Sequence, residues 1–456
     1  MLYDKIVSRT LVDKGWSADR KYCARMADGT CCLLRISPAD KLEGVSKCYS
    51  HMKEAEKLGI SMCRALEWGT CQEGVYMLQS WVDGDDAEAA IPRLAPASQY
   101  SYGLAAGRDL RKLHSIPAPS DLQPWETRFG RKIDRKLRMY EDSALKYEED
   151  IGMISYIREN RHLIASRPDS YQHGDHHIGN MMINSSGELI LIDFEKEDHG
   201  DPWEEFNRIV WSAQAAPAFA SGIVDGYFEG DVPQRFWQLL ALYICINSLG
   251  SLPWAIPFGE GEILVMRRQQ KQILEWYDHM RRIVPTWYSR PVVLRPMVFP
   301  DRDMYVELLL DATVAKTYMV PEDIDETMAD RIFIRTLELS SRQDRYIRTV
   351  CLGLVPIGVL HDVGINGTVA ELGWAILPGY HDRGHCTQAL KLAMEEMAHL
   401  GYTEIRAAAF RTNGASIRVM EKNGMEPTGE CETISYKGTG HQCVYHAKRL
   451  ERTDNG

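Results

Sequence analysis

The sequence predicts a two-domain protein of the α+β class. Its 456 residues exceed what one ordinary hydrophobic core supports. Residues 1 to about 82 alternate short β-rich runs with turns, whereas residues 83 to about 288 are helical in pattern. The segment Val284–Pro291 then ends the helix-rich part and precedes a fresh strand. We expect a first domain over 1–288, with a small β lobe and a helical lobe, and a second over 289–456.

Composition narrows the class of protein. The chain has 53 Lys and Arg against 64 Asp and Glu, a net charge of -11. This mild acidity argues against nucleic acid and suits a neutral or cationic substrate, although a merely soluble surface explains it equally well. The eleven cysteines are scattered without zinc spacing, so we expect reduced thiols. Met1–Thr10 has no apolar signal core, and no apolar run approaches the roughly 20 residues of a membrane span. We therefore expect a cytoplasmic enzyme with no membrane partner and leave its oligomeric state open.

The small lobe begins with three strands. Gly15–Ala24, Asp28–Gly29 and Cys31–Ser37 indicate a strand, a loop, a strand, a hairpin turn and a strand. The Gly/Ser turn containing Ser17 offers backbone N–H groups for nucleotide phosphates, although any hairpin has such residues.

Arg35 lies in an otherwise apolar strand, where a kinase usually places a lysine that contacts phosphate and pairs with a helical glutamate. The helical segment Val45–Leu58 offers Glu54 or Glu56 as that partner. An exposed ion pair is an equally good interpretation.

The helical lobe follows an apolar strand at Tyr76–Val82, which would lead into a hinge between lobes. The acidic run Asp83–Asp86 is interpreted as a solvated loop. Helical spacing then predicts a helix over Tyr100–His114, and Arg128–Arg138 indicates an amphipathic helix with a charged face rather than an anion site.

The stretch Gln172–Asn180 carries the chemistry of the first domain. If Met181–Asn184 and Glu188–Ile192 are strands of one hairpin, Asn180 and Asp193 lie at the same end of it, beside Asp175. Phosphoryl transfer uses a carboxylate that accepts the proton of the substrate hydroxyl, and an Asn and an Asp that hold magnesium. This stretch therefore predicts a base, Asp175, and two metal ligands.

Downstream, Asp201, Pro202 and Glu204 have the spacing of a capping box, so we expect a helix to start there. A structural role for Asp201 is favoured over a catalytic one.

The second domain contains a strand, loop and helix that suit an anion. The strand Val369–Leu377 leads through a Gly-containing loop into the helix Thr387–Leu400. Free N–H groups and the helix dipole at such a junction attract a pyrophosphate. Glu404–Phe410 is a further strand, and Asn413–Met425 indicates a helix that ends at a glycine.

Residues 1 to about 288 resemble the aminoglycoside phosphotransferase family, whose fold is like that of protein kinases. The resemblance is carried by His173-Gly174-Asp175, Asn180, Ile192-Asp193-Phe194 and Gly200-Asp201-Pro202-Trp203. It implies ATP or GTP as donor, Asp175 as catalytic base and Asn180 and Asp193 as Mg²⁺ ligands.

Residues about 290 to 451 resemble a GNAT-type N-acetyltransferase with a mixed sheet. The residues on which this resemblance rests are Val293-Leu294-Arg295-Pro296, Glu371-Leu372-Gly373-Trp374, Arg383-Gly384-His385-Cys386-Thr387, Asn413, Ser416, Glu421-Lys422 and Gly424. The resemblance implies acetyl-CoA, with Arg383, Gly384, His385, Cys386 and Thr387 holding its pyrophosphate and Asn413 in the cofactor site. Asp382 stands where a second glycine is common, and Met420 where a tyrosine acid is common. Glu371 is the candidate base through a water, or a structural partner of a neighbouring strand.

These observations favour a bifunctional enzyme that phosphorylates a hydroxyl and acetylates an amine of a small, amino-bearing molecule, such as an aminoglycoside antibiotic. Two alternatives remain. The halves could be a metabolic kinase for an amino alcohol or sugar fused to an acetyltransferase for another amine or a protein terminus. Alternatively, one half could bind ligand without turnover.

Overall fold

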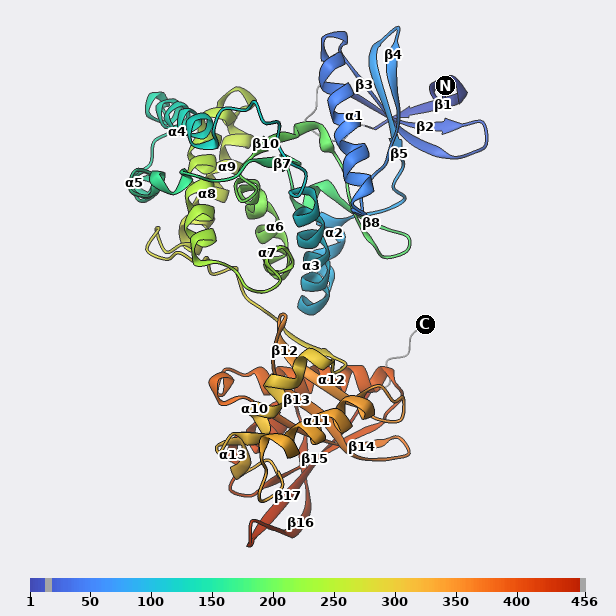
Figure 1. Ribbon diagram of the computed structural model, residues 1–456, viewed down its shortest axis with the longest axis vertical. Coiled ribbons are helices and arrows are strands. Elements are labelled where there is room, and N and C mark those ends of the chain that lie inside the picture. Colours follow the sequence, from blue (N-terminus) through green and yellow to red (C-terminus); the bar gives the residue numbers. More distant parts are fainter. Residues whose placement is uncertain (13–18, 452–456) are drawn as a thin grey trace. The chain divides into compact units, whose positions relative to one another are not determined.

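The structure is a computed structural model that describes residues 1–12 and 19–451. The chain divides into two compact units, Met1–Arg290 and Pro291–Gly456 (Figure 1). Each unit has its own hydrophobic core, and each is described here by itself.

The small lobe of the first unit is a five-stranded antiparallel sheet in the order β1-β2-β3-β5-β4. Its strands are β1 (Ile6–Leu11), β2 (Arg20–Met26), β3 (Cys31–Ser37), β4 (Ala65–Cys71) and β5 (Gly74–Ser80). The helix α1 (Leu42–Lys57) packs on β4 and β5 through a buried stripe that includes Val45, Met52 and Ala55. The sequence did not predict β4.

The helical lobe is built mainly from helices. They are α2 (Ala87–Ala90), α3 (Pro96–Leu113), α4 (Trp125–Asp142), α5 (Ile151–Asn160), α6 (Ile209–Ala215), α7 (Pro217–Phe228), α8 (Gln234–Ala255) and α9 (Glu260–Trp276). Helices α3 and α7 approach closely because glycines face each other, and a Cβ on Gly103 would meet the backbone oxygen of Phe219 at 2.1 Å. The predicted helices over Tyr100–His114 and Arg128–Arg138 correspond to α3 and α4.

The central helix of this lobe is unusually apolar. The stretch Gln234–Phe258 has a hydropathy of 1.6 and is long and apolar enough, by length and composition, to cross a membrane. We expected no apolar run that approaches the length of a membrane span. This stretch reaches that length, so the expectation is wrong for length and composition. Because 72% of the apolar window is buried inside the protein, core packing accounts for its apolar character.

The first unit also contains two small sheets. One pairs β7 (Ser170–Gln172) with β10 (Asp198–Gly200), and the other has the order β6-β8-β9. Its strands are β6 (Gly84–Asp86), β8 (Met181–Asn184) and β9 (Leu189–Leu191). The acidic run after β5 is thus an exposed edge strand rather than a loop, because Gly84–Asp86 pairs with β8.

The second unit is a seven-stranded mixed sheet in the order β11-β12-β13-β14-β15-β17-β16. Its strands are β11 (Val292–Arg295), β12 (Ile347–Leu352), β13 (Val355–Asn366), β14 (Val369–Ile376), β15 (Glu404–Phe410), β16 (Glu426–Tyr436) and β17 (Thr439–Arg449), and its helices are α10 (Arg302–Leu310), α11 (Glu326–Ser340), α12 (His385–His399) and α13 (Gly414–Lys422). Neighbouring residues of β13 belong to different cores: Val359 packs with α10 and α11, and Leu360 with α12. Helices therefore cover both faces of the sheet.

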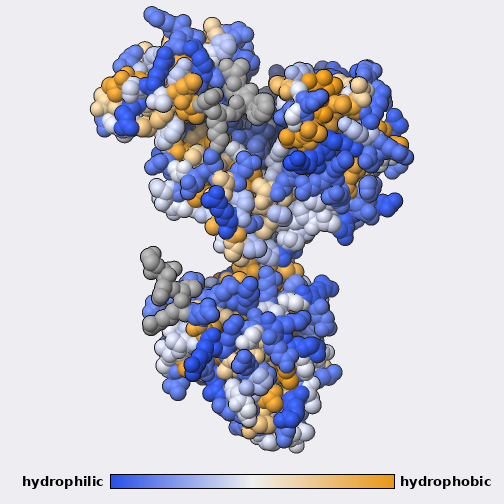
Figure 2. Space-filling model, turned by 180° about the vertical axis from the view of Figure 1, so that it is seen from behind, coloured by the Kyte–Doolittle hydropathy of each residue, from blue (hydrophilic) through white to orange (hydrophobic). Residues whose placement is uncertain are grey.

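On the face shown in Figure 2, most of the surface is hydrophilic, with hydrophobic patches of limited extent. All eleven cysteines lie in the part of the chain that the structure describes, and none forms a disulfide, which confirms the expected free thiols.

Candidate active sites

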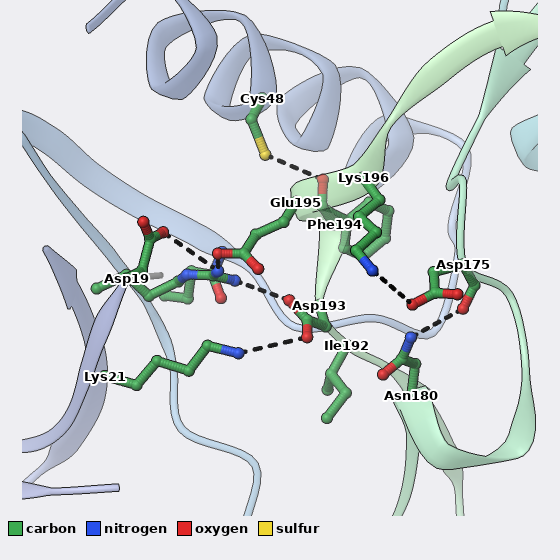
Figure 3. A network of polar contacts seen from close by, with 12 residues as sticks. Asp19, Lys21, Cys48, Asp175, Asn180, Ile192, Asp193, Phe194, Glu195 and Lys196 are labelled. Carbon is green, nitrogen blue, oxygen red and sulfur yellow. Dashed lines mark hydrogen bonds and ion pairs between the residues drawn. The ribbon is translucent and has the colours of Figure 1, made fainter. Parts of the chain in front are cut away.

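The hairpin of β8 and β9 has the predicted geometry. Met181 pairs with Leu191 and Ile183 with Leu189, and the backbone N–H of Ile192 donates to the backbone oxygen of Asn180 at 3.0 Å. This bond fixes the two chain segments that lead into Asn180 and Asp193 at one end of the hairpin. Figure 3 shows Asp175, Asn180 and Asp193 around the same space.

Asp175 is surrounded by cationic and polar groups. Its carboxylate lies 3.3 Å from Arg208 Nε, 3.6 Å from His177 Nε2 and 3.8 Å from Lys196 Nζ. Burial raises the pKa of Asp175, but the hydrogen bond from His177 and the charge of Arg208 outweigh burial and hold the pKa well below its usual value. Asp175 is therefore ionised at neutral pH.

The loop around Asp175 is held by Glu205, which the sequence did not single out. Glu205 is 3% exposed, and its two oxygens accept the backbone N–H groups of His173 at 3.0 Å and Gly174 at 2.6 Å. His114 Nε2 lies 2.9 Å from the same carboxylate. In the sequence, Glu205 stands next to Glu204 in the expected first turn of a helix, and this position gave no indication of its role.

Asp201 is structural, but not as predicted. It is fully buried, pairs with Arg167 at 2.7 Å and accepts hydrogen bonds from the Tyr243 hydroxyl at 2.6 Å and the Trp203 N–H at 3.0 Å. The expected capping box does not form, because the side chain of Glu204 pairs with Lys132. The segment that follows is a 3-10 helix, Glu204–Arg208, and the α-helix starts only at Ile209.

Asp193 adopts a left-handed backbone with φ 67°, a conformation that non-glycine residues rarely adopt. Its carboxylate contacts Arg35 Nη1 at 2.9 Å and Lys21 Nζ at 3.4 Å. Burial raises the pKa of Asp193, but the charges of Arg35 and Lys21 prevail and lower it.

The partner predicted for Arg35 is wrong. Arg35 is 2% exposed and pairs with Asp193, Asp19 and Glu195 rather than with a glutamate of α1. In α1, Glu56 instead contacts Lys53 at 3.0 Å and the backbone of Ala65. The alternative of an exposed ion pair is also wrong, because the guanidinium is buried.

A magnesium ion fits the oxygen donors at this end of the hairpin. The Asn180 amide nitrogen donates to the backbone oxygen of Asp175 at 2.8 Å, which turns its amide oxygen the other way. An amide oxygen and the Asp193 carboxylate are ligands that Mg²⁺ favours. No cluster of three or more His, Cys, Asp or Glu suited to a metal occurs within residues 1–12 and 19–451, so phosphate oxygens and water would complete the shell. Ser17, the predicted phosphate contact, lies outside the described residues.

In the second unit, the predicted pyrophosphate loop joins β14 to α12. Gly384 precedes α12 in a left-handed conformation, φ 80°, and α12 starts at His385, two residues before the expected Thr387. Within the described chain, the backbone N–H groups of residues 383–387 have no intramolecular acceptor. They are available to an anion at the helix N-terminus. Asp382 has φ 58°, which explains why glycine suits that position.

Next to this loop, β14 and β15 separate. They pair in parallel only over Val369–Glu371, so the rest of β14 has no partner on that edge. Unpaired strand groups can bind an extended chain, and the arm of acetyl-CoA is such a chain. Burial raises the pKa of the Cys386 thiol to about 12, so this cysteine stays protonated beside the loop.

Glu371 stands where the two strands part, at a cavity of about 290 Å³. The cavity is lined by Glu371, Arg406, Glu430, Cys431, Glu432 and Tyr445. Burial raises the pKa of Glu371, and the charges of Glu432 and Glu430 add to this shift, which Arg406 opposes. A raised pKa suits a carboxylate that accepts a proton from an amine.

The contacts of Asn413 and Met420 stabilise the fold of the second unit. Asn413 is the N-cap of α13, where its side chain accepts the Ser416 N–H at 3.2 Å and donates to the Ser416 hydroxyl at 3.0 Å. Met420 is fully buried in the core under α13.

Comparison with known families matches residues 8–237, half of the chain, to the phosphotransferase enzyme family, and residues 292–426 to the acetyltransferase (GNAT) domain. No curated protein sequence is similar enough to count as a match.

Similar solved structures include a GNAT acetyltransferase from Bacillus anthracis (21% identity, 36% of this chain and 96% of that one, TM-score 0.32). They also include the acetyltransferase from Salmonella typhimurium that modifies the N-terminal serine of ribosomal protein L7/L12 (17% identity, 35% of this chain and 95% of that one, TM-score 0.33). A third is spermidine N-acetyltransferase from Vibrio cholerae (14% identity, 35% of this chain and 96% of that one, TM-score 0.32). The chain belongs to the phosphotransferase enzyme family and carries a GNAT acetyltransferase domain C-terminal to the phosphotransferase domain, so it combines a phosphotransferase with an N-acetyltransferase.

Proposed function

We propose that the first unit transfers the γ-phosphoryl group of ATP or GTP, with Mg²⁺, to a hydroxyl group of a small molecule. The observation that carries this proposal is the position of Asn180 and Asp193 at one end of the β8–β9 hairpin, beside Asp175. Bound magnesium supplies positive charge that offsets the phosphate oxygens.

In this reaction the acceptor oxygen bonds to the γ-phosphorus, the bond from that phosphorus to the bridging oxygen breaks, and the hydroxyl proton passes to Asp175. Because its pKa is low, Asp175 is a weak base that orients the hydroxyl and takes the proton late. Glu205 positions the loop that carries it.

For the second unit we propose transfer of an acetyl group from acetyl-CoA to an amine. The N-terminus of α12 would hold the pyrophosphate, and Glu371 would accept a proton from the attacking amine through a water. Three glutamates around this cavity support a cationic amine as acceptor, so an aminoglycoside is a candidate for this unit. We place both reactions in the cytoplasm.

Two product assays on the full chain test this function. ADP or GDP release is measured with Mg²⁺ and kanamycin, gentamicin or choline, and CoA release is measured with the same compounds and spermidine. Transfer to a hydroxyl by one unit and to an amine by the other supports the proposal. An absence of both transfers, with nucleotide and acetyl-CoA nevertheless bound, contradicts it.

One observation favours a second candidate, in which the first unit binds nucleotide without turnover. Arg35 and Lys21 already neutralise Asp193, so magnesium must compete with two cations for this carboxylate. Single-turnover measurement with labelled ATP distinguishes the candidates, because a binding module returns all label as ATP.

A further inference from the structure

The guanidinium of Arg35 is held in place by three carboxylates. Its Nη1 donates to Asp193 Oδ1 at 2.9 Å, and its Nη2 lies 3.4 Å from Asp19 Oδ2 and also pairs with Glu195. The side chain is only 3% exposed. If Arg35 turned toward a phosphate, it would leave these partly buried carboxylates without their shared partner, which is costly. The network therefore favours a structural role for Arg35, which is to hold Asp193.

A second cation reaches Asp193 from the neighbouring strand. Lys21 of β2 pairs directly with Arg35 of β3, and residues opposite each other on neighbouring strands have their side chains on the same face of the sheet. Lys21 Nζ lies 3.4 Å from Asp193 Oδ2, whereas Arg35 contacts Oδ1. Because the two cations contact different oxygens of one carboxylate, Lys21 can leave Oδ2 while Arg35 keeps Asp193 paired.

Lys21 is held more loosely than Arg35. Its side chain is 12% exposed, and among the described residues Asp193 is the only hydrogen-bond or ion-pair partner of its ammonium group. An ammonium group has three N–H donors, so donors remain for a further anion. Burial and the charge of Arg35 lower the pKa of Lys21, and the charge of Asp193 opposes them. A second negative group beside Lys21 would offset this cost of burying its charge.

Lys21 also lies on the side of the site where the donor belongs. Figure 3 shows Lys21 on one side of Asp193, and Asp175 and Asn180 on the other. In phosphoryl transfer the attacking and leaving oxygens lie roughly in line on opposite sides of the γ-phosphorus. Because the acceptor hydroxyl lies at Asp175, the remaining phosphates of the donor lie away from Asp175, toward Lys21.

We propose that Lys21 binds the phosphate groups of the donor nucleotide, moving to them from Asp193 Oδ2, while Arg35 stays on Asp193 as a positioning residue. This inference rests on the proposed phosphotransferase function. It assigns the phosphate contact to β2 rather than to β3, where a kinase usually carries its lysine. A compact ammonium group on a flexible stem suits such a movement better than a guanidinium that three carboxylates hold.

Calorimetry on the full chain tests this assignment with two ligands, a non-hydrolysable ATP analogue and adenosine, or their guanosine counterparts if the wild type prefers them. Acetyl-CoA is kept saturating, so that neither ligand enters the second unit. We expect Lys21→Met to weaken binding of the analogue at least 10-fold, because a charge-assisted hydrogen bond is lost, and to leave adenosine binding unchanged. Lys21→Arg, which restores the charge, should recover part of the affinity.

The matched control is Arg25→Met, which removes an exposed cation from the same strand and should leave both affinities unchanged. A Mg²⁺ titration separates a direct contact from an effect through Asp193. Lys21→Met removes a cation that competes with Mg²⁺ for Asp193, so the loss of affinity for the analogue should persist at saturating Mg²⁺. A loss that disappears at saturating Mg²⁺ would mean that Lys21 acts only through Asp193, and it overturns the assignment.

Two further results would overturn the assignment and leave the phosphotransferase function intact, provided that phosphoryl transfer still depends on Asp175. In the first, Lys21→Met binds the analogue as tightly as the wild type. In the second, Lys21→Met loses affinity for the analogue and for adenosine to the same extent. A wild type that binds no analogue at any Mg²⁺ concentration contradicts the phosphotransferase function itself, and the assignment of Lys21 fails with it.

Discussion

Replacing Arg35 tests the buried charge network that joins the two lobes of the first unit. Arg35→Met keeps the length of the side chain and removes its charge, which leaves Asp19, Asp193 and Glu195 without their shared partner. Removing one partner of a fully buried ion pair costs about 3–5 kcal/mol. These carboxylates are 16%, 29% and 21% exposed, so water compensates in part, and we expect a loss of about 2–3 kcal/mol for the first unit at pH 7.

The loss depends on pH in a defined direction. The pKa of Asp193 is lowered in the folded protein, so its pairing stabilises the fold above the pKa of the unfolded chain and is lost as the pH falls through the folded pKa. In Arg35→Met, Asp193 takes up its proton at a higher pH. The difference in stability between variant and wild type should therefore shrink between pH 7 and pH 4.

Pulse proteolysis in urea measures this stability on the full chain, because the first unit can be followed as its own fragment. Arg20→Met is the matched control, since the ion pair of Arg20 with Glu73 is largely exposed, and its urea midpoint should match the wild type. An Arg35→Met variant that is as stable as Arg20→Met at pH 7, or whose loss grows toward pH 4, would refute the reasoning.

Two further predictions concern the two sites. Glu205→Gln should lower kcat for phosphoryl transfer at least 10-fold while acetyl transfer is unchanged, since an amide cannot accept both loop N–H groups, and paired rate assays check this. Gly384→Val should weaken acetyl-CoA binding at least 10-fold in calorimetry, because valine is strained at φ 80°, whereas Gly379→Val, in the same loop without a positive φ, should bind normally.

The hairpin that carries Asn180 and Asp193 was predictable because it depends on local rules. Two apolar strands separated by a short polar turn fix their own register, and register places the flanking residues. The same holds for α12, whose apolar residues repeat at helical spacing.

Contacts between distant segments were not predictable. Arg35 and Asp193 are separated by 158 positions, and nothing in either segment indicates that the β3 arginine turns toward the hairpin rather than toward α1. Asp193 also needs a left-handed backbone that no sequence pattern reveals. Glu205 was missed because a glutamate in a first helical turn has an adequate local explanation.

The strand β16 shows a different limit. Nearly all of its residues are exposed, so it lacks the alternation of apolar and polar residues that identifies a strand.

The central claim is that one chain carries two separate transferase sites. Asp175→Asn and Glu371→Gln, each in the full-length protein, test it when phosphoryl transfer from ATP and acetyl transfer from acetyl-CoA are measured on the same preparations. We predict that Asp175→Asn loses phosphoryl transfer at least 100-fold and keeps acetyl transfer, and that Glu371→Gln does the reverse with a smaller loss of about 10-fold or more. If either variant lost both activities while still folded, or if Asp175→Asn kept full phosphoryl transfer, the claim would be contradicted.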